Sequence, residues 1–291
     1  MATELPALRR SLPERRQGRA CDKALRARRE ATGGVAVPEE VAALPRVGGV
    51  PCVIVGEESA PRIILHLHGG GYRLGSAAGW KGFARRLAVK ADARIILPEY
   101  ALAPERPFPA AIVDTLTALA ELLATVRNTP VFLSGDSAGG GIALAAAAAL
   151  KERRRLAGLI LLSPWIDLRV RAGSYFRCAG TDALFSHAAA AASANDYLQG
   201  WPSDDDLASP LLADLAGLPP TCVIASTTEV LADDSVELVR SLAAHNVPLL
   251  LLMRPGLAHD WPCVTPETVE ADHALGVIAD FVASDLSHPK S

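Results

Sequence analysis

The sequence predicts an α/β fold in which a mostly parallel sheet is covered by helices on both faces. Short apolar runs typical of buried strands alternate with segments of helical pattern, and the connections between them are short. Half of the 291 residues are hydrophobic and only 21% are charged, so the chain can bury a sizeable core. No repeat or low-complexity linker divides the chain, and we therefore expect a single domain over residues 1–291.

The strands are predicted from runs of Val, Ile and Leu bounded by turn residues. Residues 1–45, which precede these runs, are rich in arginine and partly helical in pattern, so we expect an N-terminal arm or cap there. A polar turn at residues 56–59 joins the first two strands. The predicted strands are residues 50–55, 62–68, 94–97, 131–133, 159–162, 221–225 and 249–253.

The helices are predicted from apolar residues at helical spacing. Residues 167–206 interrupt the regular alternation with a mixture of Gly, Ser, Asp and aromatic residues, and we interpret this segment as an insertion that lies over the domain. The predicted helices are residues 80–90, 110–126, 139–150, 187–198, 233–245 and 266–286.

Charge and cysteine content argue against several classes of protein. A net charge of −3 gives no support to a nucleic-acid binder. No apolar run approaches the ~18–20 residues that cross a bilayer, and the first residues lack the basic and apolar regions of a secretory signal. Scattered cysteines are typical of free thiols in a reducing compartment, so we expect a cytoplasmic protein. Because they lack C-x-x-C pairing, we do not expect them to bind a metal. The cysteines are Cys21, Cys52, Cys178, Cys222 and Cys263.

The strongest local signal is a serine on a strand-to-helix turn. Residues 135–139 read Gly-Asp-Ser-Ala-Gly, between a short apolar run and an Ala-rich helix. A sharp turn there needs small neighbours, lifts the hydroxyl of Ser137 above the sheet and directs helix N–H groups at it. The pattern therefore predicts a nucleophile, although a glycine-rich turn without catalysis has the same sequence.

A second glycine-rich signal, His-Gly-Gly-Gly, occupies residues 68–71 directly after a predicted strand. Consecutive glycines expose backbone N–H groups, and two of these, with the N–H of Ala138, can bind an oxyanion. The alternatives are a flexible loop or a phosphate loop. A phosphate loop ends in Gly-Lys-Ser/Thr, whereas Tyr72 and Arg73 follow here.

A serine nucleophile needs a base, and chain order in this fold class is Ser, acid, His. Of the seven histidines, four follow Ser137 beyond the insertion. Only His259 directly follows a predicted strand, at the sheet edge where the serine turn is expected. We therefore expect His259 to be the base. The others are His245, His273 and His288.

The acid is expected after the strand at residues 221–225, where three carboxylates compete. Glu229 lies in the loop that follows the strand, whereas Asp233 and Asp234 lie where a helix begins. Acidic residues in a first turn are explained by the helix dipole alone. We favour Glu229 as the acid that orients His259, with Asp233 or Asp234 as alternatives.

In combination these motifs make the chain resemble the hormone-sensitive lipase family of α/β-hydrolases, the bacterial family IV esterases, from about residue 45 onward. The resemblance implies an eight-stranded sheet with a helical cap built from residues 1–45 and about 168–210. It also implies roles for six residues. These are nucleophile Ser137, base His259, acid Glu229 and the oxyanion N–H groups of Gly70, Gly71 and Ala138. The motifs are residues 68–72 with Gly75-Ser76, and residues 99–105, 135–140, 163–167 and 229–234.

Two positions depart from the family's pattern. At residues 99–105 the usual Asp-Tyr-Arg reads Glu-Tyr-Ala, which removes an arginine from an expected ion pair near the oxyanion loop. Many members have Gly after the catalytic histidine, where this chain has Asp260 and then Trp261. A carboxylate there either perturbs the pKa of His259 or faces solvent, and we expect the second.

The predicted function is hydrolysis of short- to medium-chain acyl esters through an acyl-enzyme. The alternatives with the same triad are lactone or N-acetyl amide hydrolysis and, less favoured, acyl transfer or a non-catalytic ligand receptor. We expect no metal or organic cofactor, a small-molecule ester as substrate, no stable membrane insertion and, from the family's habit, a homodimer. Candidate pocket residues are the aromatics Tyr72, Trp80, Phe185, Tyr197, Trp201 and Trp261, with Tyr175 and Phe176 beside them.

Overall fold

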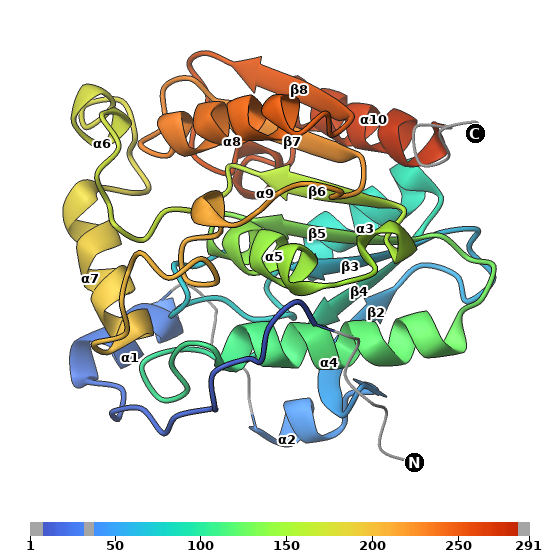
Figure 1. The fold of residues 1–291 in the computed structure, drawn as a ribbon, viewed down its shortest axis with the longest axis horizontal. Coiled ribbons are helices and arrows are strands. Elements are labelled where there is room, and N and C mark those ends of the chain that lie inside the picture. Colours follow the sequence, from blue (N-terminus) through green and yellow to red (C-terminus); the bar gives the residue numbers. More distant parts are fainter. Residues whose placement is uncertain (1–7, 32–37, 285–291) are drawn as a thin grey trace.

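The structure, a computed structural model, describes residues 8–31 and 38–284, and the remaining residues are left out of the description. Its centre is an eight-stranded sheet in the order β1-β2-β4-β3-β5-β6-β7-β8 (Figure 1). The first two pairings, β1 with β2 and β2 with β4, are antiparallel, and the other five are parallel. The predicted fold, a mostly parallel sheet, is confirmed. The strands are β1 Arg46–Val47, β2 Val50–Val55, β3 Ile63–Leu67, β4 Arg94–Pro98, β5 Val131–Asp136, β6 Gly158–Leu162, β7 Thr221–Ser226 and β8 Leu249–Arg254.

The sheet differs from the sequence-based expectation at its first edge. The two-residue strand β1 was not predicted, because two residues carry no periodic signal. Strands β2 and β3, which follow each other in the chain, are not neighbours, since β4 lies between them. A parallel pair needs a crossover connection, and the helix between β3 and β4 provides it.

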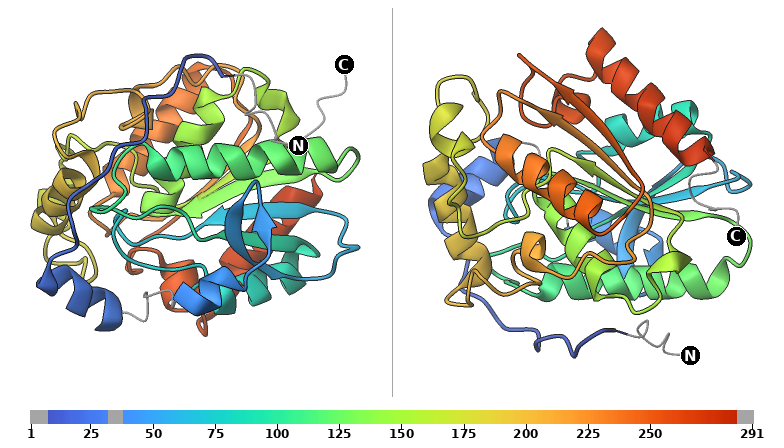
Figure 2. Two further views of the ribbon diagram at one scale, coloured as in Figure 1. Left: turned by 90° about the horizontal axis from the view of Figure 1, so that it is seen from below. Right: turned by 45° about the horizontal axis from the view of Figure 1, so that its top comes forward.

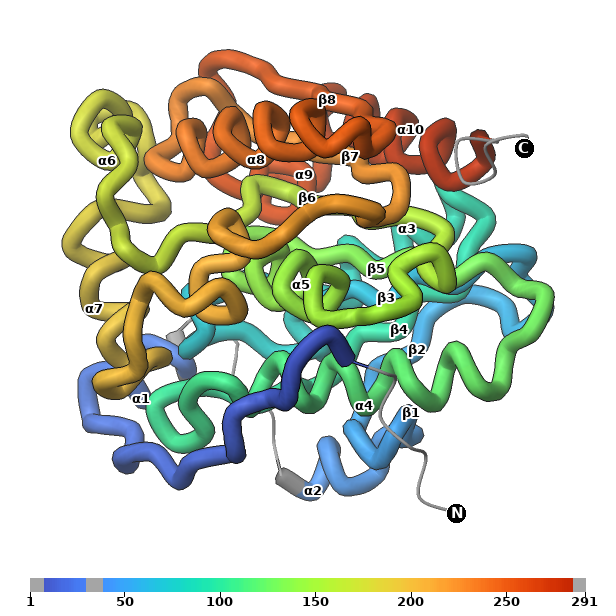
Figure 3. Tube along the Cα trace, viewed as in Figure 1, coloured from blue at the N-terminus to red at the C-terminus, as the bar shows by residue number. Residues whose placement is uncertain are grey.

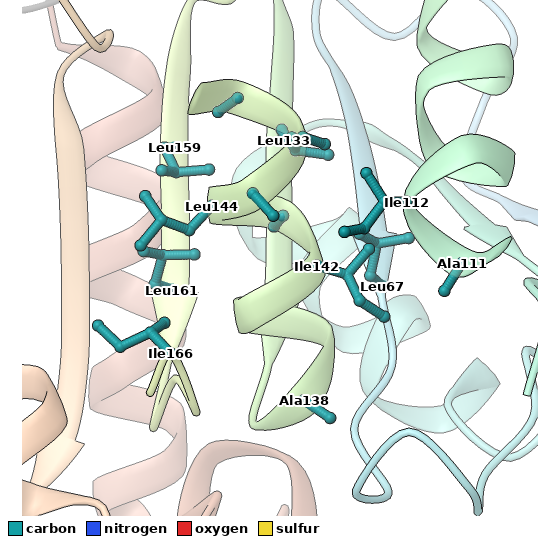
Figure 4. Close-up of a cluster of buried hydrophobic side chains, with 14 of the residues drawn as sticks. Leu67, Ala111, Ile112, Leu133, Ala138, Ile142, Leu144, Leu159, Leu161 and Ile166 are labelled. Atoms are coloured by element: carbon teal, nitrogen blue, oxygen red, sulfur yellow. The ribbon is translucent and has the colours of Figure 1, made fainter. Parts of the chain in front are cut away.

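Helices cover both faces of the sheet (Figure 2). One face carries α4 (Ala110–Thr125), α5 (Ala138–Ala149) and α8 (Ala232–Ala244), and the other carries α3 (Lys81–Ala91) and α10 (Val269–Ala283). The Ala-rich α5 is buried along its whole length. Its apolar side chains meet those of the strands beneath it and of α4, as Figure 4 shows around Leu67, Leu133, Ile142 and Leu159.

Caps explain where two of the helices begin. The last helix was predicted from residue 266, but α10 begins at Val269 because the side chain of Thr268 accepts the N–H of Ala271. Helix α7 (His187–Leu198) matches its predicted range, and Ser186 caps it by accepting the N–H of Ala189. The short helix α9 (Trp261–Val264), just beyond His259, was not predicted.

The N-terminal segment and the insertion lie together at one end of the molecule. Helix α1 (Lys23–Ala31) lies beside α7, and α6 (Ser174–Arg177) lies beyond it (Figures 1 and 3). The chain before α1 runs along the body as an extended strap. Its arginines, together with Arg29 on α1, form ion pairs with carboxylates elsewhere in the fold. These pairs are Arg9–Asp214, Arg10–Asp205, Arg15–Asp114, Arg19–Asp196 and Arg29–Glu105. Further along, the chain includes α2 (Pro38–Ala42) and the short 3-10 turns at Arg153–Arg155 and Pro210–Leu212.

Over residues 8–31 and 38–284, no helix is both long and apolar enough to cross a membrane.

Candidate active site

Ser137 stands on a strained turn between β5 and α5. Its backbone has φ 50° and ψ −119°, a conformation that costs energy and is typical of functional turns. The turn closes tightly, since a Cβ at Gly135 would lie 2.3 Å from the carbonyl oxygen of Gly139, and one at Gly139 would lie 2.0 Å from that of Leu67. The backbone N–H of Ser137 donates to Leu162 at 2.9 Å. The small residues that flank Ser137 are therefore required by the geometry.

Ser137, His259 and Glu229 form one line of hydrogen bonds. The Nε2 atom of His259 lies 2.9 Å from Ser137 Oγ, and Nδ1 lies 2.7 Å from Glu229 Oε2. Glu229 is fully buried, and its second oxygen accepts the N–H of Ser226 at 3.0 Å. With its proton on Nδ1, the imidazole donates to Glu229 and accepts the hydroxyl proton of Ser137, which is the arrangement that a serine nucleophile requires.

The two alternative acids are engaged elsewhere. Asp233 accepts the N–H of Ser174 at 2.8 Å and pairs with Arg177. Asp234 accepts the N–H groups of Ile166 and Asp167 at 3.1 and 3.2 Å. Among the three predicted carboxylates, the structure brings only Glu229 to His259.

The glycine loop after β3 presents backbone N–H groups toward the serine. Gly70 has φ 120°, and a Cβ there would lie 2.3 Å from the carbonyl oxygen of Leu74, so only glycine fits. Within the described residues, no hydrogen bond uses the N–H of Gly70 or Gly71. Ala138 is the first residue of α5, where an N–H has no partner within the helix. Gly70 and Gly71 line the same cavity as Ser137, and Ala138 directly follows Ser137 in the chain.

The region that lacks the expected arginine is supported in another way. The backbone N–H of Ala101 donates to Asp114 at 2.9 Å, and that buried carboxylate pairs with Arg15 of the strap and with Arg106. Glu99 accepts the N–H of Ala77 at 2.8 Å. The oxyanion loop itself is held by the next residue, Tyr100, whose hydroxyl donates to the carbonyl oxygen of His68 at 2.6 Å and whose ring stacks on that imidazole.

The expectation that Asp260 faces solvent is wrong. Its side chain is buried, and Oδ2 lies 3.2 Å from Nε2 of His259, the atom that also contacts Ser137. Asp260 adopts a left-handed backbone with φ 55°, and its N–H donates to Ser163 Oγ at 3.2 Å. This backbone turns the carboxyl inward, and the sequence carries no signal for it, because Asp is tolerated in both conformations.

Burial and neighbouring charges act on the two adjacent groups. Burial by itself lowers the pKa of His259, but the carboxylates of Asp260 and Glu229 outweigh it, so the pKa of the imidazole is raised. Burial raises the pKa of Asp260 well above its ordinary value, against the lowering effect of His259. Both shifts follow from placing a carboxyl and an imidazole in contact away from water.

A cavity of about 330 Å³ opens in front of Ser137. Of the predicted pocket aromatics, Trp80 and Phe185 line it. The other four do not line it: Tyr72 stacks on Tyr197 with centroids 4.0 Å apart, the half-buried Trp201 packs on Phe108, and Trp261 is buried at α9. Tyr175 is also buried and Phe176 is exposed. Wall residues that the sequence did not single out are Arg28, Arg73, Leu74, Leu184, Ala189, Ser193 and Val264.

Comparison with known proteins supports the fold. The sequence model for the alpha/beta hydrolase fold matches residues 64–263. A solved esterase from the bacterial hormone-sensitive lipase family superposes with a TM-score of 0.80 at 31% identity, covering 90% of this chain and 92% of that one.

This chain belongs to the hormone-sensitive lipase family of α/β-hydrolases. A solved family member from a metagenome library superposes with a TM-score of 0.81 at 29% identity, covering 92% of this chain and 93% of that one. An esterase of Acinetobacter venetianus is 35% identical, over 79% of this chain and 78% of its own length. An acetyl-hydrolase of Streptomyces hygroscopicus is 34% identical, over 76% of this chain and 75% of its own. The matches span most of both chains, so the family resemblance extends beyond the local motifs.

Proposed function

We propose that this protein is a serine carboxylesterase that hydrolyses short- to medium-chain acyl esters through an acyl-enzyme. Like the esterases to which it is related, it is a carboxylic ester hydrolase. The observation that carries the proposal is the line of hydrogen bonds from Glu229 through His259 to Ser137, at 2.7 and 2.9 Å, which ends in the cavity.

In the first half of the reaction, Ser137 Oγ attacks the ester carbonyl while Nε2 of His259 takes the hydroxyl proton. Glu229 stabilises the imidazolium that forms. The backbone N–H groups of Gly70, Gly71 and Ala138 stabilise the oxyanion of the tetrahedral intermediate, where each such donor contributes roughly 10²–10³ in turnover. The imidazolium then gives its proton to the leaving alcohol.

In the second half, water replaces the alcohol. His259 takes a proton from the water as its oxygen bonds to the acyl carbon, and returns a proton to Ser137 Oγ as the acid departs. The same base thus serves both halves, and the serine is regenerated without any change in the other residues.

The cavity supports the proposed range of acyl chains. A volume of about 330 Å³ is near the lower end of small-molecule pockets, which span roughly 300–1,000 Å³. The side chains around it include Leu74, Trp80, Leu184 and Phe185, which favour an apolar acyl group. Two relatives, an esterase and an acetyl-hydrolase, fit the same range of acyl groups.

The remaining features of the proposal concern the protein as a whole. We place residues 1–45 and the insertion at about 168–210 in a cap over the cavity, where residues 1–7 and 32–37 lie outside the described residues. Arg28, Phe185 and Ser193 from the described parts of these segments line the cavity. The five free cysteines support a cytoplasmic location. A homodimer and the absence of a nucleic-acid partner are further parts of the proposal, supported by family habit and by net charge.

The decisive experiment compares hydrolysis of p-nitrophenyl esters from acetate to laurate by the wild type and by Ser137→Ala. We expect the short esters to be turned over rapidly and the variant to retain less than about one part in a thousand of the rate. Ser193→Ala, a serine in the same cavity wall, is the matched control and should remain active. Covalent labelling by a fluorophosphonate should follow the same pattern.

Two outcomes would contradict the proposal. Retention of more than a few per cent of the rate by Ser137→Ala would remove the serine from the chemistry. Labelling of Ser137 without turnover of any ester would redirect the function to the alternatives with the same triad. A panel of lactones and N-acetyl amides, and product analysis with added alcohols, would then separate hydrolysis of those bonds from acyl transfer.

A further inference from the structure

The base of the site has a carboxyl group on each side of its ring. Glu229 Oε2 lies 2.7 Å from Nδ1 of His259, and Asp260 Oδ2 lies 3.2 Å from Nε2. The second nitrogen is the one that must take the proton of Ser137, which lies 2.9 Å away. A serine hydroxyl and a carboxyl thus approach the same imidazole nitrogen.

Asp260 has few other partners that could hold its charge. Its Oδ1 is buried without a hydrogen-bond partner among the described residues. The backbone N–H of Asp260 donates to Ser163 Oγ. A carboxylate without donors in a dry environment is costly, so contact with an imidazolium is the main stabilisation that the charged form finds here.

The other titratable groups around the pair include two cations of the cavity wall, Arg28 and Arg73, of which Arg73 is paired with Asp196. The remaining groups are acidic or neutral. From the insertion, Asp182 accepts the N–H groups of Leu184, Phe185 and Val230. From β5, Asp136 accepts from His66 Nε2 at 3.0 Å. From α9, the half-buried Cys263 lies near Asp260, and desolvation raises the pKa of its thiol, so it stays neutral. Glu229 contacts the other nitrogen of the imidazole.

The charges therefore favour an imidazolium more strongly than a single triad acid would. An opposite charge within about 4–6 Å shifts a pKa by about 1–3 units, and burial removes the solvent screening that would weaken the effect. Two carboxyl groups meet that distance condition at His259, one on each nitrogen.

We propose that Asp260 is a positioning residue of the reaction, whose carboxyl competes with Ser137 for the Nε2 proton of His259 and thereby sets the pH above which His259 is free to act as a base. The inference rests on the esterase function proposed above. Below that pH one proton is held between Asp260 and His259. Above it the proton is released to water, and Nε2 can accept the proton of Ser137.

The test is the pH dependence of kcat/KM for p-nitrophenyl acetate, in the wild type and in Asp260→Asn. The variant removes the charge and keeps the shape. We expect the midpoint of the acid limb to move to lower pH by about one unit or more. At a pH near the midpoint of the variant's acid limb, the variant should therefore retain a larger fraction of its own maximal kcat/KM than the wild type does. This comparison does not depend on the maximal value that either protein reaches. Asp272→Asn, which removes an exposed carboxylate paired with Lys90, is the charge-matched control and should leave the midpoint in place.

A second readout makes the result independent of the ester substrate, and a second variant makes it independent of the amide that Asp260→Asn introduces. The pH dependence of inactivation by a fluorophosphonate should shift by the same amount, and Asp260→Ala should shift both profiles in the same direction. An acid limb that stays at the wild-type pH in both active variants would overturn the role of Asp260. That outcome would leave the proposed esterase function intact. The esterase function itself fails only if the wild type neither turns over esters nor is labelled at Ser137.

Discussion

The ring of Phe185, in the insertion, stacks on the imidazole of His259, with centroids 5.7 Å apart and planes 19° apart. The same phenyl ring meets Trp165 edge to face, with centroids 5.2 Å apart. Phe185 thus connects His259 to an aromatic side chain of the core and lines one side of the cavity. The orientation of His259 depends on a residue from a different part of the chain.

Replacing Phe185 tests that dependence. An aromatic pair contributes about 0.5–1.5 kcal/mol beyond its buried area, so Phe185→Ala should lower kcat/KM for p-nitrophenyl acetate by roughly 2–10-fold. The larger cavity should also shift preference toward longer acyl chains. Phe176→Ala, which removes an exposed ring of the same segment, should change neither quantity. Equal losses in both variants would point to general loosening of the segment.

The identity of the acid can be decided by charge-removing variants. Glu229→Gln keeps the shape but removes the charge that orients His259, and kcat should fall by about 10³–10⁴. Asp233→Asn, which breaks a pair with Arg177 away from the imidazole, should retain most of the activity. Steady-state rates on one ester compare the two directly. A larger loss in Asp233→Asn than in Glu229→Gln would exclude Glu229 as the acid.

The oxyanion loop can be tested at Gly70. A methyl group there meets the carbonyl oxygen of Leu74 at 2.3 Å, so Gly70→Ala must displace the loop and its N–H groups. We expect kcat to fall by about 10²-fold or more. Gly200→Ala is the matched control, since Gly200 also has a positive φ, of 84°, but open space around its Cβ position. Circular dichroism would verify folding, and similar activity in both variants would count against the loop's role.

Asp234 should give the protein a pH-dependent stability. Burial raises its pKa to about 8 in the folded state, from an ordinary value of 3.8. Between these pH values the folded state binds a proton that the unfolded state releases. The contribution of Asp234 to the free energy of unfolding is therefore most favourable below pH ~4 and declines as pH rises toward ~8. The free energy of unfolding of Asp234→Asn, relative to wild type, should therefore rise over that range and then level off.

Urea unfolding at several pH values measures this difference. Asp233→Asn serves as the control, because its hydrogen bond with Arg177 lowers the pKa of Asp233 and confines its effect to more acidic pH. A stability difference between Asp234→Asn and wild type that is constant from pH 4 to 8 would mean that the buried carboxyl is ionised throughout.

The sequence predicts the parts of the site that depend on chain order and leaves out those that depend on packing. Ser137, Glu229 and His259 each follow a strand, and parallel strands bring their ends to one edge. The direction of a large aromatic side chain follows no such rule. Tyr72 is buried in the core and Trp201 packs against the core, so neither lines the cavity, and their spacing in the sequence gives no sign of it.

Asp260 illustrates the same limit at the scale of one dihedral angle. A φ of 55° decides whether its carboxyl meets water or the base, and the residue type permits either. Likewise the strap of arginines reads as a solvated charged segment, because the carboxylates that pair with Arg9, Arg15 and Arg29 lie from about 75 to 205 residues further along the chain.

The strap has a consequence for how the protein responds to its medium. Residues before α1 are attached to the body in part by exposed arginine–carboxylate pairs, such as Arg9–Asp214 and Arg10–Asp205, each worth about 0–1 kcal/mol and weakened by dissolved salt. The sheet and its helices are held by apolar burial, which salt does not weaken in this way. Concentrated electrolyte should therefore weaken the attachment of the strap at salt concentrations that leave the sheet and its helices folded.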